Sequence, residues 1–213
     1  YPDSGIQALK DINLEVQPGT SLGIIGRTGS GKSTLAQLIP RMIAPTSGRI
    51  TIHGECISDL RSDELRENIG YVPQEVFLFS DTISNNITFG ASASEEAIVK
   101  AARIADVHDN ILGFPQGYQT QLGERGINLS GGQKQRISIA RAIIKNPEIL
   151  LFDDCLSAVD THTEDRIIRE LKPLMKGKTS IVIAHRISTV KDADQIIYLE
   201  HGRIAERGTH AEL

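Results

Sequence analysis

One octapeptide constrains this 213-residue chain more than any other stretch. Residues 26–33 read GRTGSGKS and fit the pattern G-x-x-x-x-G-K-[ST]. A short apolar run at 21–25 precedes the octapeptide and apolar residues at helical spacing follow it, so it lies between a strand and a helix. Its glycines let backbone N–H groups turn around an anion, Lys32 can reach the β- and γ-phosphates of a nucleotide, and the Ser33 hydroxyl can bind Mg²⁺. The motif therefore predicts a nucleotide phosphate site.

The overall composition narrows the class of protein. Hydrophobic residues make up 39% of the chain and charged residues 23%, which is typical of a soluble globular domain. The net charge of −4 argues against a nucleic-acid partner, because proteins that bind nucleic acids usually carry an excess of basic residues. Cys56 and Cys155 lie far apart, so we expect neither a zinc site nor a disulfide framework, which suits a reducing cytosol. No apolar run reaches the length of a membrane span and no signal peptide opens the chain. Its abrupt start and end favour a piece of a longer protein.

Apolar strand patterns alternate with helical patterns, which predicts an α/β domain with a largely parallel sheet covered on both faces. The strand patterns lie at 21–25, 69–72, 149–152 and 180–184, with a hairpin at 196–205. Helical patterns lie at 62–68 with Ser62 as the cap, at 95–105 after Ser94, at 131–145 and at 163–175. Shorter strands at 12–16 and 49–54 predict a small antiparallel sheet beside the nucleotide. We expect one domain, 1–213, with its core in 1–74 and 146–213 and a helical insertion at 75–145.

Polar side chains stand where several predicted strands end. Ligands of open α/β sheets bind at the carboxyl ends of the strands, so Asp153 can hold Mg²⁺ opposite Ser33, while a turn-capping Asp is the structural alternative. Asp154 beside it is placed to polarise an attacking water. The amide of Gln74 could touch Mg²⁺ or that water, and the imidazole of His185 could contact a γ-phosphate and orient the water.

A second helix start is also suited to an anion. Residues 129–133 read LSGGQ, where Ser130 can cap a helix and the glycines leave backbone N–H groups free. The helical insertion separates this site from the phosphate loop, so one nucleotide cannot easily contact both within one chain. A second chain could supply the partner.

The order of these motifs resembles the nucleotide-binding domain of ATP-binding cassette (ABC) transporters. The matching motifs are the Walker A loop 26–33, the Q-loop Gln74, the signature 129–133, Walker B 149–153, the D-loop 157–160 and the switch His185. The resemblance implies the ABC ATPase fold, a P-loop NTPase core with a small antiparallel β subdomain and an inserted α-helical subdomain. It also implies a head-to-tail dimer that binds two ATP molecules with Mg²⁺, each between the Walker A loop of one chain and the signature of the other.

The resemblance assigns roles residue by residue. Tyr1 is implied to stack on adenine, although a frayed terminus is the structural alternative. The implied nucleotide-binding residues are Tyr1, Gly26, Thr28, Gly29, Ser30, Gly31, Lys32, Ser33, Thr34, Gln74, Leu129, Ser130, Gly131, Gly132, Gln133, Asp160 and His185. The implied metal ligands are Ser33, Gln74 and Asp153, and the implied catalytic residues are Asp154, His185, Gln74 and Lys32.

Two segments resemble the exporter branch of the family. Residues 123–126, GERG, are similar to the exporter X-loop, which contacts the coupling helices of the transmembrane domain, and residues 71–79 are similar to the exporter Q-loop segment. The resemblance implies an ATPase at the cytoplasmic face of a membrane, with a transmembrane domain preceding it on the same polypeptide. The transported substrate is chosen by helices outside this sequence.

Asp154 departs from the family, which usually has Glu directly after the Walker B aspartate. Asp is one methylene shorter, and a misplacement of that order can cost about 10²-fold in rate. In the family such an Asp often marks the degenerate site of a heterodimeric exporter, which predicts slow hydrolysis in isolation; a homodimer that tolerates Asp stays open. An ABC importer subunit, a soluble ABC ATPase of repair or translation, and a nucleotide-binding regulatory module with little turnover are rival functions.

Overall fold

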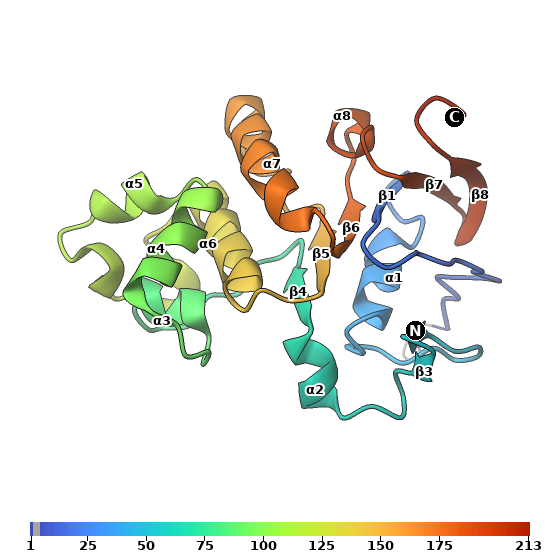
Figure 1. Ribbon diagram of the computed structural model, residues 1–213, viewed down its shortest axis with the longest axis horizontal. Helices are drawn as coiled ribbons and strands as arrows, with labels where there is room; N and C mark the ends of the chain where they lie inside the picture. The colour runs from blue at the N-terminus through green and yellow to red at the C-terminus, as the bar shows by residue number, and fades with distance from the viewer. Residues whose placement is uncertain (2–4) are drawn as a thin grey trace.

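A six-stranded sheet forms the centre of the computed structural model, which describes residue 1 and residues 5–213 (Figure 1). Its strand order is β4-β5-β6-β1-β7-β8. All neighbouring pairs are parallel except β7 and β8, which form the antiparallel hairpin. The strands are β1 (Ser21–Gly26), β4 (Ile69–Val72), β5 (Ile149–Asp153), β6 (Thr179–Ile183), β7 (Gln195–Glu200) and β8 (Arg203–Gly208). The predicted α/β class and mostly parallel sheet are confirmed.

Helices cover both faces of the sheet. Alternation along β6 turns Ile181 and Ile183 towards the cluster that contains α1, whereas Val182 faces the cluster that contains α7. The helices of this part are α1 (Lys32–Leu38), α2 (Ser62–Glu67), α7 (Thr161–Met175) and α8 (Ile187–Val190). Within the described part of the chain, no helix combines the length and the apolar character needed to cross a bilayer.

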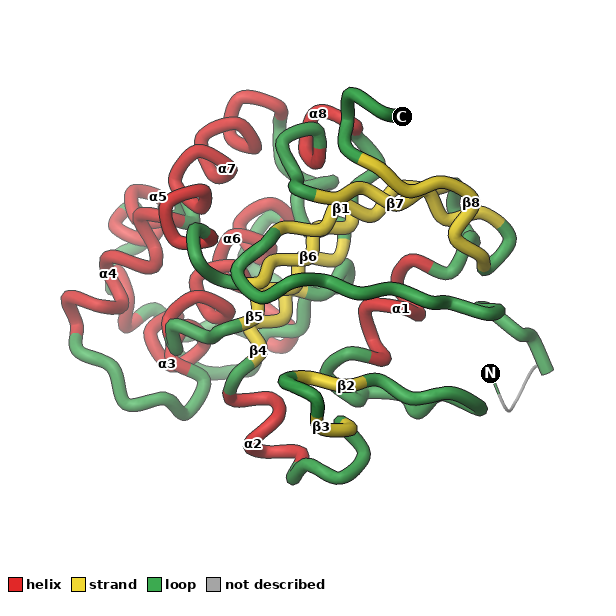
Figure 2. Tube along the Cα trace, turned by 45° about the vertical axis from the view of Figure 1, so that its right-hand side comes forward, coloured by secondary structure: helices red, strands yellow, loops and turns green. Residues whose placement is uncertain are grey.

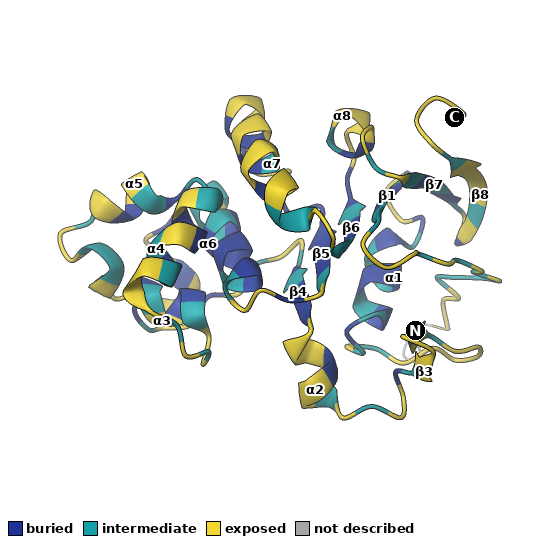
Figure 3. Ribbon diagram, in the orientation of Figure 1, coloured by how far each residue is buried: buried dark blue, intermediate teal, exposed yellow. Residues whose placement is uncertain are grey.

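A second group of helices lies beside the β4 edge of the sheet (Figure 1). It contains α3 (Ile83–Thr88), α4 (Glu95–Ile104), α5 (His108–Leu112) and α6 (Gly131–Ile144), with short 3₁₀ turns at Gly117–Gln119 and Glu124–Gly126. This is the expected helical subdomain, and its boundaries at 75 and 145 stay a prediction. It has no separate core, because Ile137 and Ile139 of α6 share one buried cluster with Leu150 and Phe152 of β5. Figure 3 shows the buried face of α6 turned inward.

The predicted caps of two helices are present. The Ser94 hydroxyl accepts a hydrogen bond from the Ala97 amide at the start of α4. At the start of α6, Ser130 and Gln133 form a reciprocal capping box. Both arrangements satisfy backbone donors that a helix start leaves free.

Two local predictions are wrong, and one helix begins earlier than predicted. Residues 12–16 form no strand but run as a long loop over the sheet (Figure 2), and the antiparallel sheet is only β2 (Thr51–Ile52) paired with β3 (Glu55–Cys56). Leu14 and Val16 still turn inward, so the alternation reflects packing rather than pairing. Ser62 is the first residue of α2 and not its cap. α7 begins two residues before the predicted 163, because Asp160 caps it through the Thr163 amide.

The close packing of α6 on β4 requires that residue 70 has no side chain. A Cβ there would lie 2.5 Å from the carbonyl oxygen of Ala142 and 2.8 Å from Pro147 Cγ. We predict that Gly70→Ala lowers the free energy of unfolding by about 1–3 kcal/mol, the usual cost of overpacking. Gly131→Ala is the matched control, because its Cβ would stay 3.9 Å from Ala158, and it should change stability by less than about 0.5 kcal/mol. Urea unfolding measures both, and equal stabilities would contradict the prediction.

Candidate functional site

The phosphate-loop motif connects β1 to α1, and its glycines are required by space. At Gly26 the backbone φ is +156°, and a Cβ would lie 2.2 Å from the carbonyl oxygen of Leu199. At Gly31 φ is +102°, and a Cβ would lie 2.7 Å from the carbonyl oxygen of Ala8. No other residue type fits either position without moving the backbone. The sequence of the loop is thus tied to its shape.

Lys32 lies at the base of the loop and is only 6% exposed. Its ammonium donates hydrogen bonds to the carbonyl oxygens of Gly26, at 2.7 Å, and Arg27, at 2.9 Å. Burial lowers the pKa of Lys32, while the nearby carboxylates of Asp154 and Asp153 act in the opposite direction. A buried ammonium surrounded by neutral carbonyls is well suited to bind an anion at the mouth of the loop.

Ser33 and Asp153 bring a hydroxyl and a carboxylate together. Ser33 Oγ donates to Asp153 Oδ1 at 3.1 Å, and the Tyr71 hydroxyl lies 3.5 Å from Asp153 Oδ2. Asp153 is 2% exposed, and this burial is the main reason that its pKa is raised. Such oxygen donors fit Mg²⁺, which commonly takes one or two protein ligands and completes its shell with phosphates and water. The described residues contain no group of three or more His, Cys, Asp or Glu that could hold a metal ion.

Asp154 and His185 form the other side of the site. Asp154 Oδ2 lies 3.6 Å from His185 Nε2, and the Asp154 side chain is largely buried while the imidazole is 44% exposed. The Asp154 amide donates to the Ile183 carbonyl at 2.9 Å, and the Ser157 hydroxyl donates to the Asp154 carbonyl at 2.9 Å. The backbone at Asp154 is left-handed, with φ of +47°, a conformation that Asp adopts more readily than most residues. Neighbouring strands thus hold a carboxylate and an imidazole in one place.

These groups border one pocket of about 530 Å³, within the range of small-molecule sites. The predicted residues that line it are Tyr1, Thr28, Gly29, Gly31, Lys32, Ser33, Thr34, Gln74, Asp153, Asp154 and His185. The Tyr1 and Thr34 hydroxyls lie 2.8 Å apart, and Gln74 is exposed at this wall. Gly26 and Ser30 are not part of the lining. Both residues support the loop with their backbone carbonyls. The Gly26 carbonyl accepts a hydrogen bond from the Lys32 ammonium, and the Ser30 carbonyl accepts one from the Gly202 amide.

Part of the pocket wall was not found from the sequence. The unpredicted lining residues are Ile6, Gln7, Ala8, Lys10, Ile183, His201 and Gly202. Most belong to the 6–10 loop or to the turn between β7 and β8. A hydrogen bond joins these two segments, because the Lys10 amide donates to the Gly202 carbonyl at 2.8 Å. Neither segment carries a sequence motif. His201 reaches the site because β7 pairs parallel with β1, which places Leu199 opposite Gly26 and lets the Gly202 amide donate to the Ser30 carbonyl.

The signature residues lie elsewhere on the chain. Leu129 is buried, Ser130 and Gly131 are exposed, and none of the signature residues, Gly132 and Gln133 included, lines the pocket. Asp160 is also outside the pocket, where hydrogen bonds from Thr163 lower its pKa. An unpredicted contact joins α6 to the segment that follows Asp154, because Gln135 Oε1 accepts a hydrogen bond from the Ala158 amide at 3.3 Å. Ala158 lies four residues after Asp154.

Comparison with known proteins gives this geometry a family. The family model described as ABC transporter matches residues 9–157. An uncharacterized ABC transporter ATP-binding protein, YfiB, of Bacillus subtilis is 50% identical over 214 residues, covering 100% of this chain and 37% of that protein. A Staphylococcus aureus protein, named as a candidate multidrug export ATP-binding/permease protein, is 48% identical with the same coverage. The chain belongs to the ABC transporter family.

A solved structure agrees with this membership. A bacterial Atm1-family ABC exporter with ATP bound matches with a TM-score of 0.94 and 44% sequence identity, over 99% of this chain and 37% of that one. The expected ABC ATPase fold is therefore confirmed. The chain spans little more than a third of the length of these relatives.

The buried carboxylate of Asp153 yields a pH-dependent prediction. Because burial raises its pKa, Asp153 holds its proton more tightly in the folded than in the unfolded chain, so its ionisation lowers stability as pH rises. We predict that Asp153→Asn stabilises the nucleotide-free chain at pH 7 and that the gain shrinks as pH falls towards 3.8, the ordinary pKa. Urea unfolding of both proteins across this range measures the effect. A loss of stability of equal size at every pH would contradict it.

Proposed function

We propose that this chain binds MgATP and hydrolyses it to ADP and phosphate, and that it powers an ABC exporter. The observation that carries the proposal is the single pocket in which the Lys32 ammonium, the Ser33–Asp153 pair and the Asp154–His185 pair meet at the carboxyl edge of the sheet. The family and the ATP-bound structural match support it.

The residues have distinct tasks in this proposal. Lys32 exchanges its loop carbonyls for β- and γ-phosphate oxygens and offsets their charge as the transition state forms. Ser33, Asp153 and Gln74 hold Mg²⁺, which neutralises phosphate charge when bound. Asp154 accepts a proton from the attacking water, whose oxygen forms a bond to the γ-phosphorus while the bond to the ADP oxygen breaks. His185, 3.6 Å from Asp154, contacts the γ-phosphate and orients that water.

The remaining parts of the nucleotide site come from other segments. Tyr1, 48% exposed on the pocket wall, stacks on adenine, and residues 26–34 surround the phosphates. A second copy or a related chain supplies Ser130 and its neighbouring glycines, with Leu129, Gln133 and Asp160 in support, because these residues lie outside the pocket of their own chain. The exposure of Ser130 and Gly131 is what such a head-to-tail contact needs.

An exposed aromatic patch is the proposed contact with the transmembrane domain. Phe77, Phe79 and Phe89 are each 43–51% exposed, and Phe79 packs on both others with ring centroids 5.0 and 5.2 Å apart. The Arg141 guanidinium packs against two of these rings, 5.8 Å from the Phe79 centroid and 5.1 Å from the Phe89 centroid. Burial lowers the pKa of Arg141 to about 10. Contiguous exposed apolar surface commonly marks an interface. We place this face against a membrane domain at the cytoplasmic side, in keeping with the permease named in the Staphylococcus relative.

The direct test of the proposal is nucleotide binding and dimer formation. We predict that Asp154→Asn, which blocks turnover, binds MgATP and becomes dimeric in analytical ultracentrifugation, because ATP then stays in place. Lys32→Ala should weaken MgATP binding by at least tenfold, whereas Ser130→Arg should leave monomer binding intact and prevent the dimer. No MgATP binding by Asp154→Asn in calorimetric titration would overturn the proposed function.

The length of the side chain at position 154 should limit turnover. We predict that Asp154→Glu raises kcat by about 10- to 10²-fold with little change in KM, because it extends the carboxylate towards the water. The same change should lower the unfolding free energy by about 1 kcal/mol, since Glu is less suited to the left-handed backbone. Phosphate release and urea unfolding measure the two effects, with Asp154→Asn as the inactive control. An unchanged or lower kcat would show that Asp154 is already well placed or is not the base.

The short carboxylate also favours one rival, a nucleotide-binding regulatory module with little turnover. Such a module would bind MgATP and dimerise yet release no phosphate, with or without its membrane domain. In the same phosphate-release assay, a heterodimer subunit would gain turnover when its partner chain is added. A homodimer would release phosphate without any other chain.

A further inference from the structure

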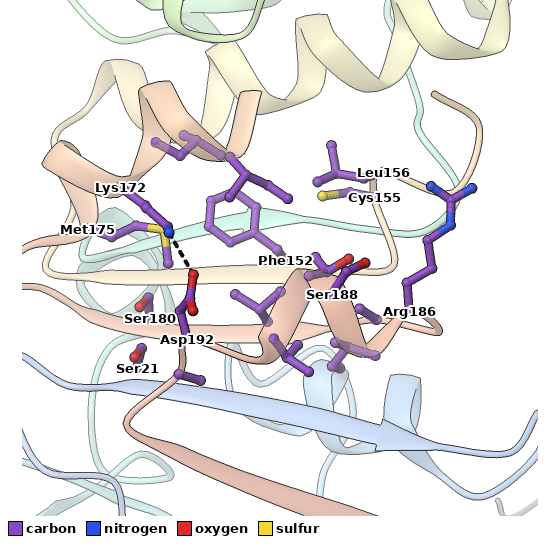
Figure 4. A pocket seen from close by; sticks show the side chains of 18 of the residues that line it. Ser21, Phe152, Cys155, Leu156, Lys172, Met175, Ser180, Arg186, Ser188 and Asp192 are labelled. Atoms are coloured by element: carbon purple, nitrogen blue, oxygen red, sulfur yellow. Dashed lines mark hydrogen bonds and ion pairs between the residues drawn. The ribbon is translucent and has the colours of Figure 1, made fainter. Parts of the chain in front are cut away.

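A second cavity, of about 580 Å³, lies between α7 and the sheet face opposite α1 (Figure 4). Phe152 of β5 and Val182 of β6 line the sheet side, and Leu171 and Met175 line the α7 side. Val182 is only half-buried although its strand is central in the sheet, because its side chain borders this space. The cavity is therefore mostly apolar and large enough for a small organic molecule.

Two polar bridges join α7 to the segment around α8 along the cavity. Lys172 pairs with Asp192 at 2.7 Å (Figure 4), and Glu164 pairs with Arg186 and accepts the Thr189 hydroxyl at 2.7 Å. Because these charges neutralise one another, the bridges themselves present no unpaired charge to a ligand. The lining also includes Lys176, Lys178, Asp154 and Asp194, so its four cationic and four acidic side chains balance, and the cavity favours a neutral molecule.

One buried hydroxyl in the cavity lacks a partner. Ser180 is 1% exposed and lies two residues before Val182 on β6, so its side chain is on the same face of the sheet. Its Oγ is among the few buried side-chain atoms of the described residues that have no hydrogen-bond partner. A buried polar group of this kind costs free energy until a partner satisfies it.

We propose that this cavity binds a neutral, mainly apolar small molecule whose single hydroxyl or carbonyl group hydrogen-bonds to Ser180. This cavity and the nucleotide pocket share three lining residues, Asp154, Ile183 and His185. A ligand in the cavity therefore lies next to the Asp154–His185 pair, on the side away from the nucleotide. Occupancy therefore changes turnover, a consequence that rests on the proposed ATPase function.

Binding is tested with 1-naphthol and, as the matched probe without a hydroxyl, naphthalene. The chain has two methionines, Met175 in the cavity wall and Met42, which is 57% exposed and outside the lining. In methionine-methyl NMR titrations, 1-naphthol should shift Met175 and leave Met42 unchanged, and it should bind about 5- to 10-fold more tightly than naphthalene. Ser180→Ala should bring the two affinities together. Equal affinities for the wild-type chain would overturn the assigned hydrogen bond, and an unshifted Met175 would overturn the site.

Occlusion from α7 supplies a second, independent variant. Ile168→Trp fills the cavity from its wall, whereas Arg169→Trp adds the same ring at an exposed position of the same helix. The first should abolish the Met175 shift and the second should retain it, with both variants unfolding in urea near the wild-type midpoint. Equal shifts in both variants would place the probe elsewhere and overturn the proposal.

The regulatory consequence is read separately, in phosphate release. Saturating 1-naphthol should change the kcat of the wild-type chain and of Arg169→Trp by at least twofold and leave that of Ile168→Trp unchanged. Binding without any change in kcat would overturn the regulatory part. A chain with no turnover at all would count against the ATPase function, while the Met175 titration would still decide whether the cavity binds.

Discussion

The buried ammonium of Lys32 is the interaction on which the nucleotide pocket depends. Its hydrogen bonds to Gly26 and Arg27 fold the loop back over the side chain, and the loop can follow this path only because Gly26 and Gly31 carry no Cβ. Two carboxylates then lie close enough to favour the charged form of the lysine against the cost of burial. The lysine, the loop shape and the acids at the end of β5 therefore form one arrangement rather than three separate features.

The sequence predicted most of this arrangement because parallel strands place their carboxyl ends at one edge. Asp153 ends β5, and Asp154 and His185 follow β5 and β6, so the apolar strand patterns and the rule for open parallel sheets together predicted that they lie close to one another. Local rules were also sufficient for Ser94 and Ser130, whose caps depend only on residues within one turn of helix.

The failures share a different cause. Alternating apolar residues at 12–16 look the same whether the backbone pairs with a strand or only packs against the core, and here it only packs. His201 lies in the pocket wall because β7 pairs with β1, and the hydrogen bond from Lys10 to Gly202 adds the 6–10 loop, which is almost the whole chain away in sequence. No periodicity or motif encodes a contact of that range. The cavity under α7 is a similar case, since its presence depends on how closely a helix sits on a sheet.

The hydrogen bond from the Ala158 amide to Gln135 has a consequence for the coupling between the two nucleotide sites of the proposed dimer. Gln135 lies on the signature helix α6, and Ala158 lies on the segment anchored to the Asp154 carbonyl by Ser157. In the proposed dimer, the signature serves the nucleotide of the neighbouring chain, whereas Asp154 serves its own. A shift of α6 on meeting the neighbour's γ-phosphate would thus be passed through this one hydrogen bond to the segment that follows Asp154, which links the two centres of the proposed dimer.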